Sequence, residues 1–208
     1  MYIDKRQLVT RIKDAAITYQ QYLVGQTYMF VYDQKKIEVI FKVDSFMHLT
    51  GVASTLKAKD FYKKAVRKSL KASEIKFDSK HPADFADIKT RYIKRLYELT
   101  ITDIFIAEDI LTMTATYAFG MTNLEFVLCC GKNTDKAGNV IDDCYVPYSF
   151  RVEEIDNGKF QELFEVDYIF KKSTNQNKYP QMTFGNTEKV KFLDQEIKDK
   201  LENCLIEE

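Results

Sequence analysis

The apolar residues of this chain change their spacing near residue 100, and this change constrains the fold more than any other feature. Before residue 100 they recur, in most segments, at every third or fourth position, which is the spacing of one helix face. After it, short runs rich in β-branched and aromatic residues alternate with polar loops, which is typical of strands. Strand–helix–strand alternation is missing, so a doubly wound parallel sheet is not expected. The order predicts an α+β fold, with N-terminal helices packed on one face of a twisted antiparallel sheet.

The length of 208 residues favours one domain, and the scarcity of glycine (7) and proline (3) argues against a long flexible linker. We therefore expect a single α+β domain over residues 1–208. Its helix-rich part should span 1–100, its strand-rich part 101–190, and a closing C-terminal helix 191–208.

Local patterns predict the elements of the helix-rich part. Polar and glycine residues suited to helix ends flank the periodic segments, as Gly25 does after the first helix. In the third helix the spacing places Phe85 and Ile88 on the inner side with Leu96. The predicted elements are helices at Asp4–Val24, Lys59–Leu70 and Ala83–Leu99, hairpin strands at Tyr28–Tyr32 and Ile37–Val43 joined by residues 33–36, and a short helical turn at Phe46–Leu49 begun by Asp44 or Ser45 and ended by Gly51.

The strand-rich part is read in the same way. A polar, glycine-containing loop at Gly131–Asn139 separates two of its strands. The predicted strands are Thr112–Phe119, Asn123–Cys130, Tyr145–Glu154, Phe164–Lys171 and Gln181–Phe184, and the closing helix is Phe192–Leu205.

Several functional classes lack their motifs. The chain has no glycine-rich nucleotide loop, no H-E-x-x-H and no G-x-S-x-G. It has two histidines and no C-x-x-C, and the adjacent Cys129 and Cys130 would point to opposite faces of a strand. We therefore expect no metal site and no cofactor, with free thiols in a reducing cytoplasm. The N-terminus lacks the apolar segment of a signal peptide, and no run of eighteen apolar residues is present, so no membrane span is expected.

His48 is the first candidate catalytic residue. It lies in Phe46–Gly51, directly after the second hairpin strand. An imidazole titrates near neutral pH, so it can pass protons between a ribose hydroxyl and a leaving 5′ oxygen. The alternative is a structural histidine whose ring bonds a backbone carbonyl. His81, in a polar segment before Pro82, is interpreted as a loop residue.

A basic run is the second candidate. The net charge of the chain is zero, so a nucleic acid would need a local patch. Residues 57–76 contain eight basic and two acidic residues. The basic run continues with Lys89, Arg91, Lys94 and Arg95. Such a stripe can follow a phosphate backbone, and the alternative is a solvated helix face. The candidate phosphate-binding residues are Lys57, Lys59, Lys63, Lys64, Arg67, Lys68 and, from a later strand, Lys171.

A third set of polar residues occurs late in the chain. Ser149 and Arg151 share one side of a predicted strand, Lys171 ends the next, and Tyr179 follows. If these strands are neighbours, the four side chains converge on one sheet face. Cations there could hold a phosphate and stabilise the charge of a pentavalent phosphorane. The alternative is an exposed sheet face with ordinary cross-strand pairs.

The order of these elements resembles a known group, the phage-associated nuclease-like domains related to barnase, EndoU, colicins and RelE-type toxins (the BECR group). The resemblance covers roughly residues 20 to 190. Its most distinctive part is the Phe-x-His-Leu-x-Gly element. The segments that carry it are Ile37–Lys42, Phe46–Gly51, Val146–Arg151 and Phe164–Phe170.

The resemblance implies an α+β fold with a curved antiparallel sheet, and RNA cleavage without metal by attack of the ribose 2′ oxygen on the adjacent phosphate. His48 would be the general acid or base. Lys42, Ser149, Arg151 and Tyr179 are further candidates for the catalytic site. The implied partner is RNA, with tRNA among the candidates, or a host ribonucleoprotein.

Two other interpretations compete. A phage-encoded inhibitor could bind a host nucleic-acid-binding machine, such as a CRISPR effector, through acidic surface. The stretches for that role are Glu98–Asp109, Asp142–Asp143, Glu153–Asp156 and Glu162–Asp167. A structural domain could instead form a homodimer through a sheet edge. The sign of the surface charge around His48 separates the nuclease from the inhibitor.

Overall fold

Nine strands form one mixed sheet in the computed structural model, which describes residues 3–111, 116–152 and 162–206. Their order across the sheet is β11-β10-β1-β2-β8-β7-β6-β5-β9. A separate two-stranded sheet pairs β3 (Ala53–Ser54) with β4 (Ile75–Lys76). The strands of the large sheet are β1 (Gln26–Tyr32), β2 (Lys35–Ile40), β5 (Phe105–Leu111), β6 (Thr116–Thr122), β7 (Val127–Thr134), β8 (Val140–Arg151), β9 (Leu163–Glu165), β10 (Tyr168–Ser173) and β11 (Gln181–Phe184).

The predicted antiparallel pairing is correct for every described neighbour pair of the large sheet except one. β2 and β8 run parallel, with Val39 opposite Tyr145. This pair joins the N-terminal hairpin β1–β2 to the antiparallel run β5–β8. About one hundred residues separate the two strands in sequence, so no local pattern could predict that they meet.

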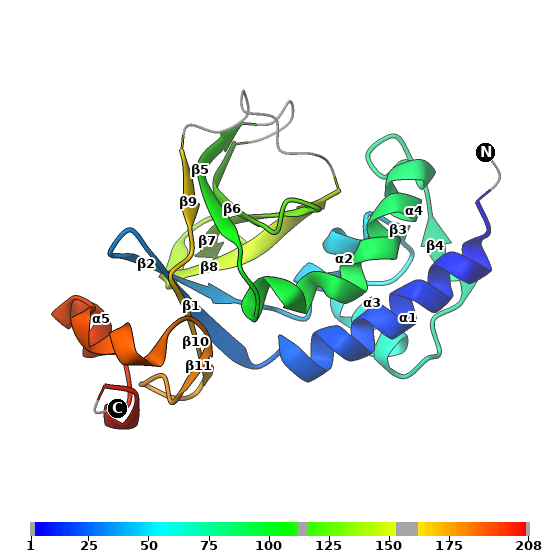
Figure 1. Cartoon of the computed structure of the whole chain (residues 1–208). Helices are drawn as coiled ribbons and strands as arrows, with labels where there is room; N and C mark the ends of the chain where they lie inside the picture. Colours follow the sequence, from blue (N-terminus) through cyan, green and yellow to red (C-terminus); the bar gives the residue numbers. More distant parts are fainter. Residues whose placement is uncertain (1–2, 112–115, 153–161, 207–208) are drawn as a thin grey trace.

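The helices of the first half cover one face of this sheet, as the α+β prediction requires (Figure 1). They are α1 (Lys5–Tyr22), α2 (Ser45–Thr50), α3 (Ala58–Val66) and α4 (Ala83–Tyr92), with short 3₁₀ turns at Ala72–Glu74 (η1) and Ile93–Thr100 (η2). Between the helices and the sheet lies the main core, to which Ile12 and Tyr19 of α1, Phe46 of α2, and Phe30 and Phe150 of the sheet all contribute.

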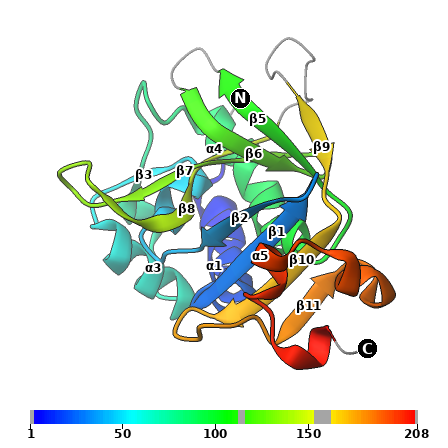
Figure 2. The same ribbon diagram turned by 90° about the vertical axis from the view of Figure 1, so that its left-hand side faces the viewer.

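A second core lies on the opposite face of β1 and β10, under the C-terminal segment. Figure 2 shows this segment in front of the sheet and α1 behind it. The segment consists of η3 (Thr187–Phe192), α5 (Gln195–Lys198) and η4 (Asn203–Leu205). Its apolar side chains pack against Met29, Val31, Phe170 and Tyr179.

The prediction of one closing helix over Phe192–Leu205 is therefore wrong, although Leu193, Ile197 and Leu201 are buried as the pattern indicated. The reason is a competing set of backbone hydrogen bonds. The Tyr179 amide donates to the carbonyl of Lys200 at 2.8 Å, and the Glu202 amide donates to the carbonyl of Tyr179 at 3.0 Å. In a continuous helix, the Lys200 carbonyl and the Glu202 amide would instead form hydrogen bonds with backbone groups four residues away.

The N-terminal elements follow the local signals closely. Asp4 caps α1 by accepting a hydrogen bond from the Arg6 amide at 2.8 Å, and Gly25 follows the helix at φ 77°. Strands β1 and β2 are joined by only two residues, Asp33 and Gln34, both at positive φ, which is the type I′ hairpin turn. The predicted connection of four residues was too long.

The side of α4 that faces the core differs from the prediction. Phe85 and Ile88 are 58% and 41% exposed, whereas Ala86 and Thr90 are buried. The cause is the close approach of α4 to the end of α2, where the Cα of Ala86 lies 3.5 Å from the position a Cβ would take at Gly51. Only a small residue fits between the two backbones, so the larger side chains lie outside.

Some strand boundaries also differ. The first strand of the second half is β5, which the sequence pattern did not predict. Of the strand predicted at Thr112–Phe119, residues 112–115 lie outside the described residues. The strand predicted at Phe164–Lys171 is two strands, β9 and β10, which pair with different partners.

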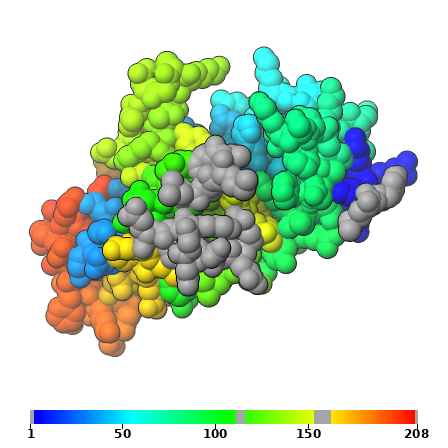
Figure 3. Space-filling model, turned by 90° about the horizontal axis from the view of Figure 1, so that it is seen from above, coloured from blue at the N-terminus to red at the C-terminus, as the bar shows by residue number. Residues whose placement is uncertain are grey.

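The β7–β8 hairpin projects from the body of the protein. Figure 3 shows its yellow-green residues separated by a notch from the cyan and teal residues of the helical half. Among the described helices, none is both long and apolar enough to cross a membrane.

Candidate active site

Two of the candidate catalytic residues flank or lie on α2. Lys42 stands between β2 and α2, and His48 is exposed in the last turn of the helix. Gly51 ends α2 at φ 75°, and its amide donates to the carbonyl of His48 at 3.2 Å. A Cβ at Gly51 would lie 2.8 Å from Cδ of Lys89 on α4. The Phe-x-His-Leu-x-Gly element thus needs its glycine for both the left-handed turn and the contact with α4.

Lys42 is held by a chain of polar side chains that the sequence did not reveal. Its Nζ donates to Oδ1 of Asn133, and Nδ2 of Asn133 donates to Oδ2 of Asp142 at 2.8 Å. Asn133 is buried and lies where the β7–β8 register shifts, between Lys132 and Thr134. Such a bulge re-aims a side chain, so the projecting hairpin supplies the two residues that fix the half-buried Lys42 ammonium. Asn133 therefore lies in β7 and not in the polar loop that the sequence predicts at Gly131–Asn139.

Three aromatic side chains, Tyr19, Phe46 and Tyr62, pack together on the core side of α2. The Tyr19 hydroxyl donates to the carbonyl of Lys42 at 3.0 Å. The Tyr62 ring packs against Phe46 and Tyr19, with ring centroids 5.4 and 6.0 Å apart. Burial raises the pKa of Tyr62 to about 12, so its hydroxyl stays protonated at neutral pH. Packing of this kind keeps the α2 backbone in one position, as a site that must hold its residues precisely requires.

The basic run lies mostly on and beside α3, which packs against α2. Lys64 is already compensated, because its Nζ forms an ion pair with Glu74. Arg91 pairs with Asp87, and Arg95 pairs with Glu98 and Glu125. The exposed cations on α3 and directly at its two ends have no ion pair within the described part of the chain; they are Lys57, Lys59, Lys63, Arg67 and Lys68. The helix that packs against α2 thus carries these exposed cations together with the exposed carboxylate of Asp60.

This surface gives a testable expectation for nucleic-acid binding. Replacing Lys63 and Arg67, one helical turn apart, by glutamine should weaken RNA binding for every sequence. Each lost phosphate contact should also reduce the slope of log affinity against log salt by about 0.7 for a single strand. Fluorescence anisotropy over a salt series measures both quantities. Lys64→Gln is the matched control, because Lys64 already pairs with Glu74. An equal loss in the control would contradict the assignment.

The condition for convergence of the late polar residues, that their strands are neighbours, is not met. β8 and β10 are separated by β2 and β1, so the strands of Ser149 and Lys171 are not neighbours. Ser149 and Arg151 lie opposite Cys129 and Val127, on the sheet face away from Phe150 and the main core. Lys171 is half-buried on β10, which Figures 1 and 2 both place apart from α3.

Tyr179 is completely buried in the second core. Its hydroxyl donates to Oε2 of Glu38 at 2.7 Å, and the Lys172 ammonium lies 4.6 Å from the centre of its ring. Lys200 donates to the other oxygen of Glu38. Tyr179 thus joins β2 to the C-terminal segment, and its hydroxyl is engaged inside the protein.

This cluster predicts acid-dependent stability. Burial acts to raise the pKa of Glu38, but the hydrogen bonds from Lys200 and Tyr179 outweigh it and leave the pKa below the ordinary value of 4.5. The unfolded state then binds the proton first, so this stabilisation exists above the unfolded pKa and is lost as pH falls through the folded pKa. The stability difference between the native protein and Glu38→Gln should therefore shrink on acidification from about pH 7 to about pH 3.5. Urea unfolding at each pH measures it, and a constant difference would contradict the assignment.

The comparison with protein families decides the relationship. Residues 11–188 match the model of PBECR4, described as phage-Barnase-EndoU-ColicinE5/D-RelE like nuclease4. The chain belongs to this family. Searches of curated proteins and of solved structures gave no match.

The PBECR4 match includes α2, the basic helix α3 and the β7–β8 hairpin, so the whole candidate site lies within it. It confirms the resemblance that rested on β2, the α2 element, β8 and the β9–β10 segment. The match ends at residue 188, before most of the C-terminal segment. Within the described residues, no three His, Cys, Asp or Glu side chains group as a metal site would need. A nuclease-like function follows from membership in PBECR4, with a nucleic acid as the expected substrate.

Proposed function

We propose that this PBECR4 domain cleaves RNA without a metal ion and leaves 2′,3′-cyclic phosphate ends. The observation that carries the proposal is that α2 bears the exposed His48, follows the fixed Lys42 and packs against α3, the helix that carries uncompensated cations. A proton-transfer group, a fixed cation and a phosphate-binding surface are three of the parts that this reaction uses.

The proposed step is an internal transfer at phosphorus. A base removes the proton of the ribose 2′ hydroxyl, the 2′ oxygen forms a bond to phosphorus, and the bond from phosphorus to the 5′ oxygen breaks. An acid gives a proton to the leaving 5′ oxygen. His48 serves as the base or the acid, and Lys42 stabilises the extra negative charge on the phosphorane.

The reaction is assigned to His48 and Lys42 rather than to all five candidates. Ser149 and Arg151 belong to the other face of the sheet, and the Tyr179 hydroxyl is bound to Glu38. A role for these three in the same chemistry would require groups from separate faces to come together. We propose instead that Tyr179 is structural.

The inhibitor interpretation finds less support in the surface charges. On α3, which packs against α2, and at its two ends, the exposed cations outnumber the one exposed acidic residue, Asp60, and this balance favours the nuclease. Several acidic residues of the proposed inhibitor surface are already engaged, because Glu98 pairs with Arg95, Glu108 with Lys35, and Asp142 with Asn133. Residues 153–156 lie outside the described residues. A homodimer through a sheet edge is not part of the proposal, since the edge strands β11 and β9 have four and three residues.

The test is incubation of the purified protein with tRNA and with a structured RNA in the presence of EDTA. Cleavage that leaves 2′,3′-cyclic phosphate ends is the expected result. Intact RNA after incubation with folded protein would overturn the proposed reaction, and 5′-phosphate products would indicate a different mechanism. Binding without cleavage would favour a partner interaction, which a pull-down for a host ribonucleoprotein would then examine.

A further inference from the structure

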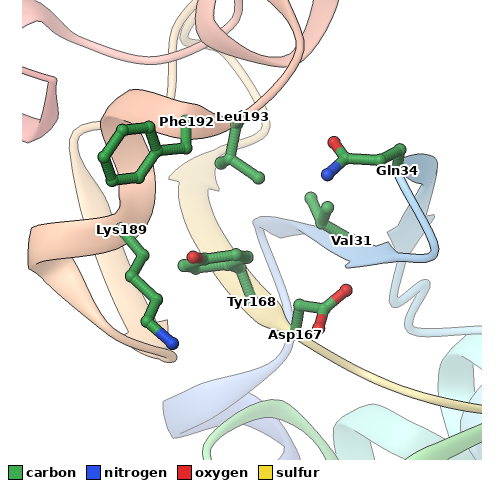
Figure 4. A pocket seen from close by; sticks show the side chains of 7 residues that line it. All are labelled: Val31, Gln34, Asp167, Tyr168, Lys189, Phe192 and Leu193. Carbon is green, nitrogen blue, oxygen red and sulfur yellow. The ribbon is translucent and has the colours of Figure 1, made fainter.

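A shallow pocket of about 180 Å³ lies far from α2, between the β1–β2 turn, the start of β10 and η3. Figure 4 shows its lining side chains, with Phe192 and Leu193 on one side and Gln34 and Asp167 across from them. Its residues are Val31, Gln34, Asp167, Tyr168, Lys189, Phe192 and Leu193. This volume is below the range of about 300–1,000 Å³ usual for drug-sized ligands, so it suits one small planar group.

Phe192 is the most unusual member of the pocket. Its side chain is 74% exposed, more than any other large apolar residue in the part of the chain that the structure describes. The ammonium of the neighbouring Lys191 lies 5.6 Å from its ring centre. An exposed aromatic ring beside a cation is the combination on which unpaired bases stack in proteins that bind single strands.

The floor of the pocket is rigid. The Tyr168 ring is 8% exposed and stacks on Phe170, with centroids 5.9 Å apart and an interplanar angle of 11°. On its edge lies Gly185 at φ 123°, where a Cβ would come within 2.6 Å of Cδ1 of Tyr168. Val31 and Leu193 complete an apolar floor that is held from beneath by the second core.

The rim carries polar groups that can read the edge of a base. The Asp167 amide is fixed by a 2.8 Å bond to the carbonyl of Val31, and its carboxylate is exposed. Gln34 is placed by the tight β1–β2 turn, and the Lys189 side chain lies on the opposite wall. A carboxylate accepts hydrogen bonds from the exocyclic amine of a base. Uracil has no such amine.

We propose that this pocket binds one amino-bearing base, such as cytosine, of a single-stranded RNA, with Phe192 stacking on it and Asp167 accepting from its amine. The inference builds on the proposed RNA substrate, but the binding itself does not need cleavage to occur. Gln34 and Lys42 are eight residue steps apart along β2 and its flanks, about 26 Å at the strand rise of about 3.3 Å per residue. A dinucleotide therefore cannot reach both places, whereas a longer RNA can.

Fluorescence anisotropy with short cytidine and uridine oligonucleotides tests the pocket directly. The native protein should bind the cytidine oligonucleotide more tightly. Phe192→Ala should weaken that binding by about 5- to 150-fold, the range found for loss of one base–aromatic stack. Asp167→Ala should remove the preference for cytidine. Phe85→Ala is the matched control, because Phe85 is 58% exposed on α4 and does not line the pocket.

Equal affinity of Phe192→Ala and the native protein would overturn the proposal, and so would an equal loss in Phe85→Ala. A preference for cytidine that survives in Asp167→Ala would overturn the role of Asp167. Cleavage provides an independent comparison. Phe192→Ala should cleave a dinucleotide at the native rate and a long RNA with a raised KM. If the native protein does not cleave RNA but Phe192→Ala still binds the cytidine oligonucleotide more weakly than the native protein does, the proposed reaction is wrong and the proposed base-binding pocket is supported.

Discussion

His48→Ala should reduce RNA cleavage by about 100-fold or more while leaving the protein folded. Loss of a general acid or base usually costs a factor of about 10² to 10⁴. His48 is exposed on α2, and the core side chains of that helix are its neighbours Phe46 and Leu49. The substitution should therefore remove proton transfer without creating a cavity. The measurement is the initial rate on a structured RNA in EDTA, with circular dichroism to verify folding.

His81→Ala is the control for His48→Ala, since these are the two histidines of the chain. His81 lies before α4, where its Nδ1 is 2.9 Å from Oδ1 of Asp78. We expect its cleavage rate to equal that of the native protein. An unchanged rate in folded His48→Ala would remove the mechanism as stated. An equally reduced cleavage rate in both variants would contradict the assignment of proton transfer to His48.

Tyr179→Phe should lower the free energy of unfolding by about 1.5–3 kcal/mol, the usual value of a hydrogen bond to a charged group. The phenol is completely buried and donates to Oε2 of Glu38. Without it, this carboxylate oxygen retains Lys172 at 3.8 Å as an ion-pair partner. Phenylalanine keeps the ring, so the loss reports the hydrogen bond rather than packing. Urea unfolding measures the change.

Tyr22→Phe is the matched control for Tyr179→Phe. Tyr22 is 37% exposed and stacks on Tyr97, with ring centroids 4.6 Å apart. Its free energy of unfolding should change by no more than about 0.5 kcal/mol. The two roles considered for Tyr179 also separate here. A structural role leaves cleavage per folded molecule unchanged, whereas a loss of cleavage at native stability would restore Tyr179 to the catalytic set.

Part of the candidate site was predictable from sequence. The α2 element, with His48 within it and Gly51 at its end, and the basic α3 after it are consecutive in the chain, so local patterns place them together, although Asp44 makes no side-chain cap at α2. Asn133 and Asp142 were not predictable. Asn133 reaches Lys42 from 91 residues away and through a register shift in β7, and Asp142 contacts Asn133. A polar, glycine-containing segment predicts a solvent loop, and this pattern does not reveal that a bulge buries one of its side chains.

The sequence alone determined the elements whose hydrogen bonds close within a few residues, such as α1 with its Asp4 cap, the β1–β2 hairpin and α2, and it determined the family. Only the tertiary structure decided what depends on distant backbone groups. It paired β2 with β8, which placed Ser149 and Lys171 on separated strands. It also paired Tyr179 with Leu201, which replaced a C-terminal helix and buried the phenol. The physical reason is that a periodic pattern fixes which face of a segment is apolar, whereas the partner that buries this face is chosen by the whole fold.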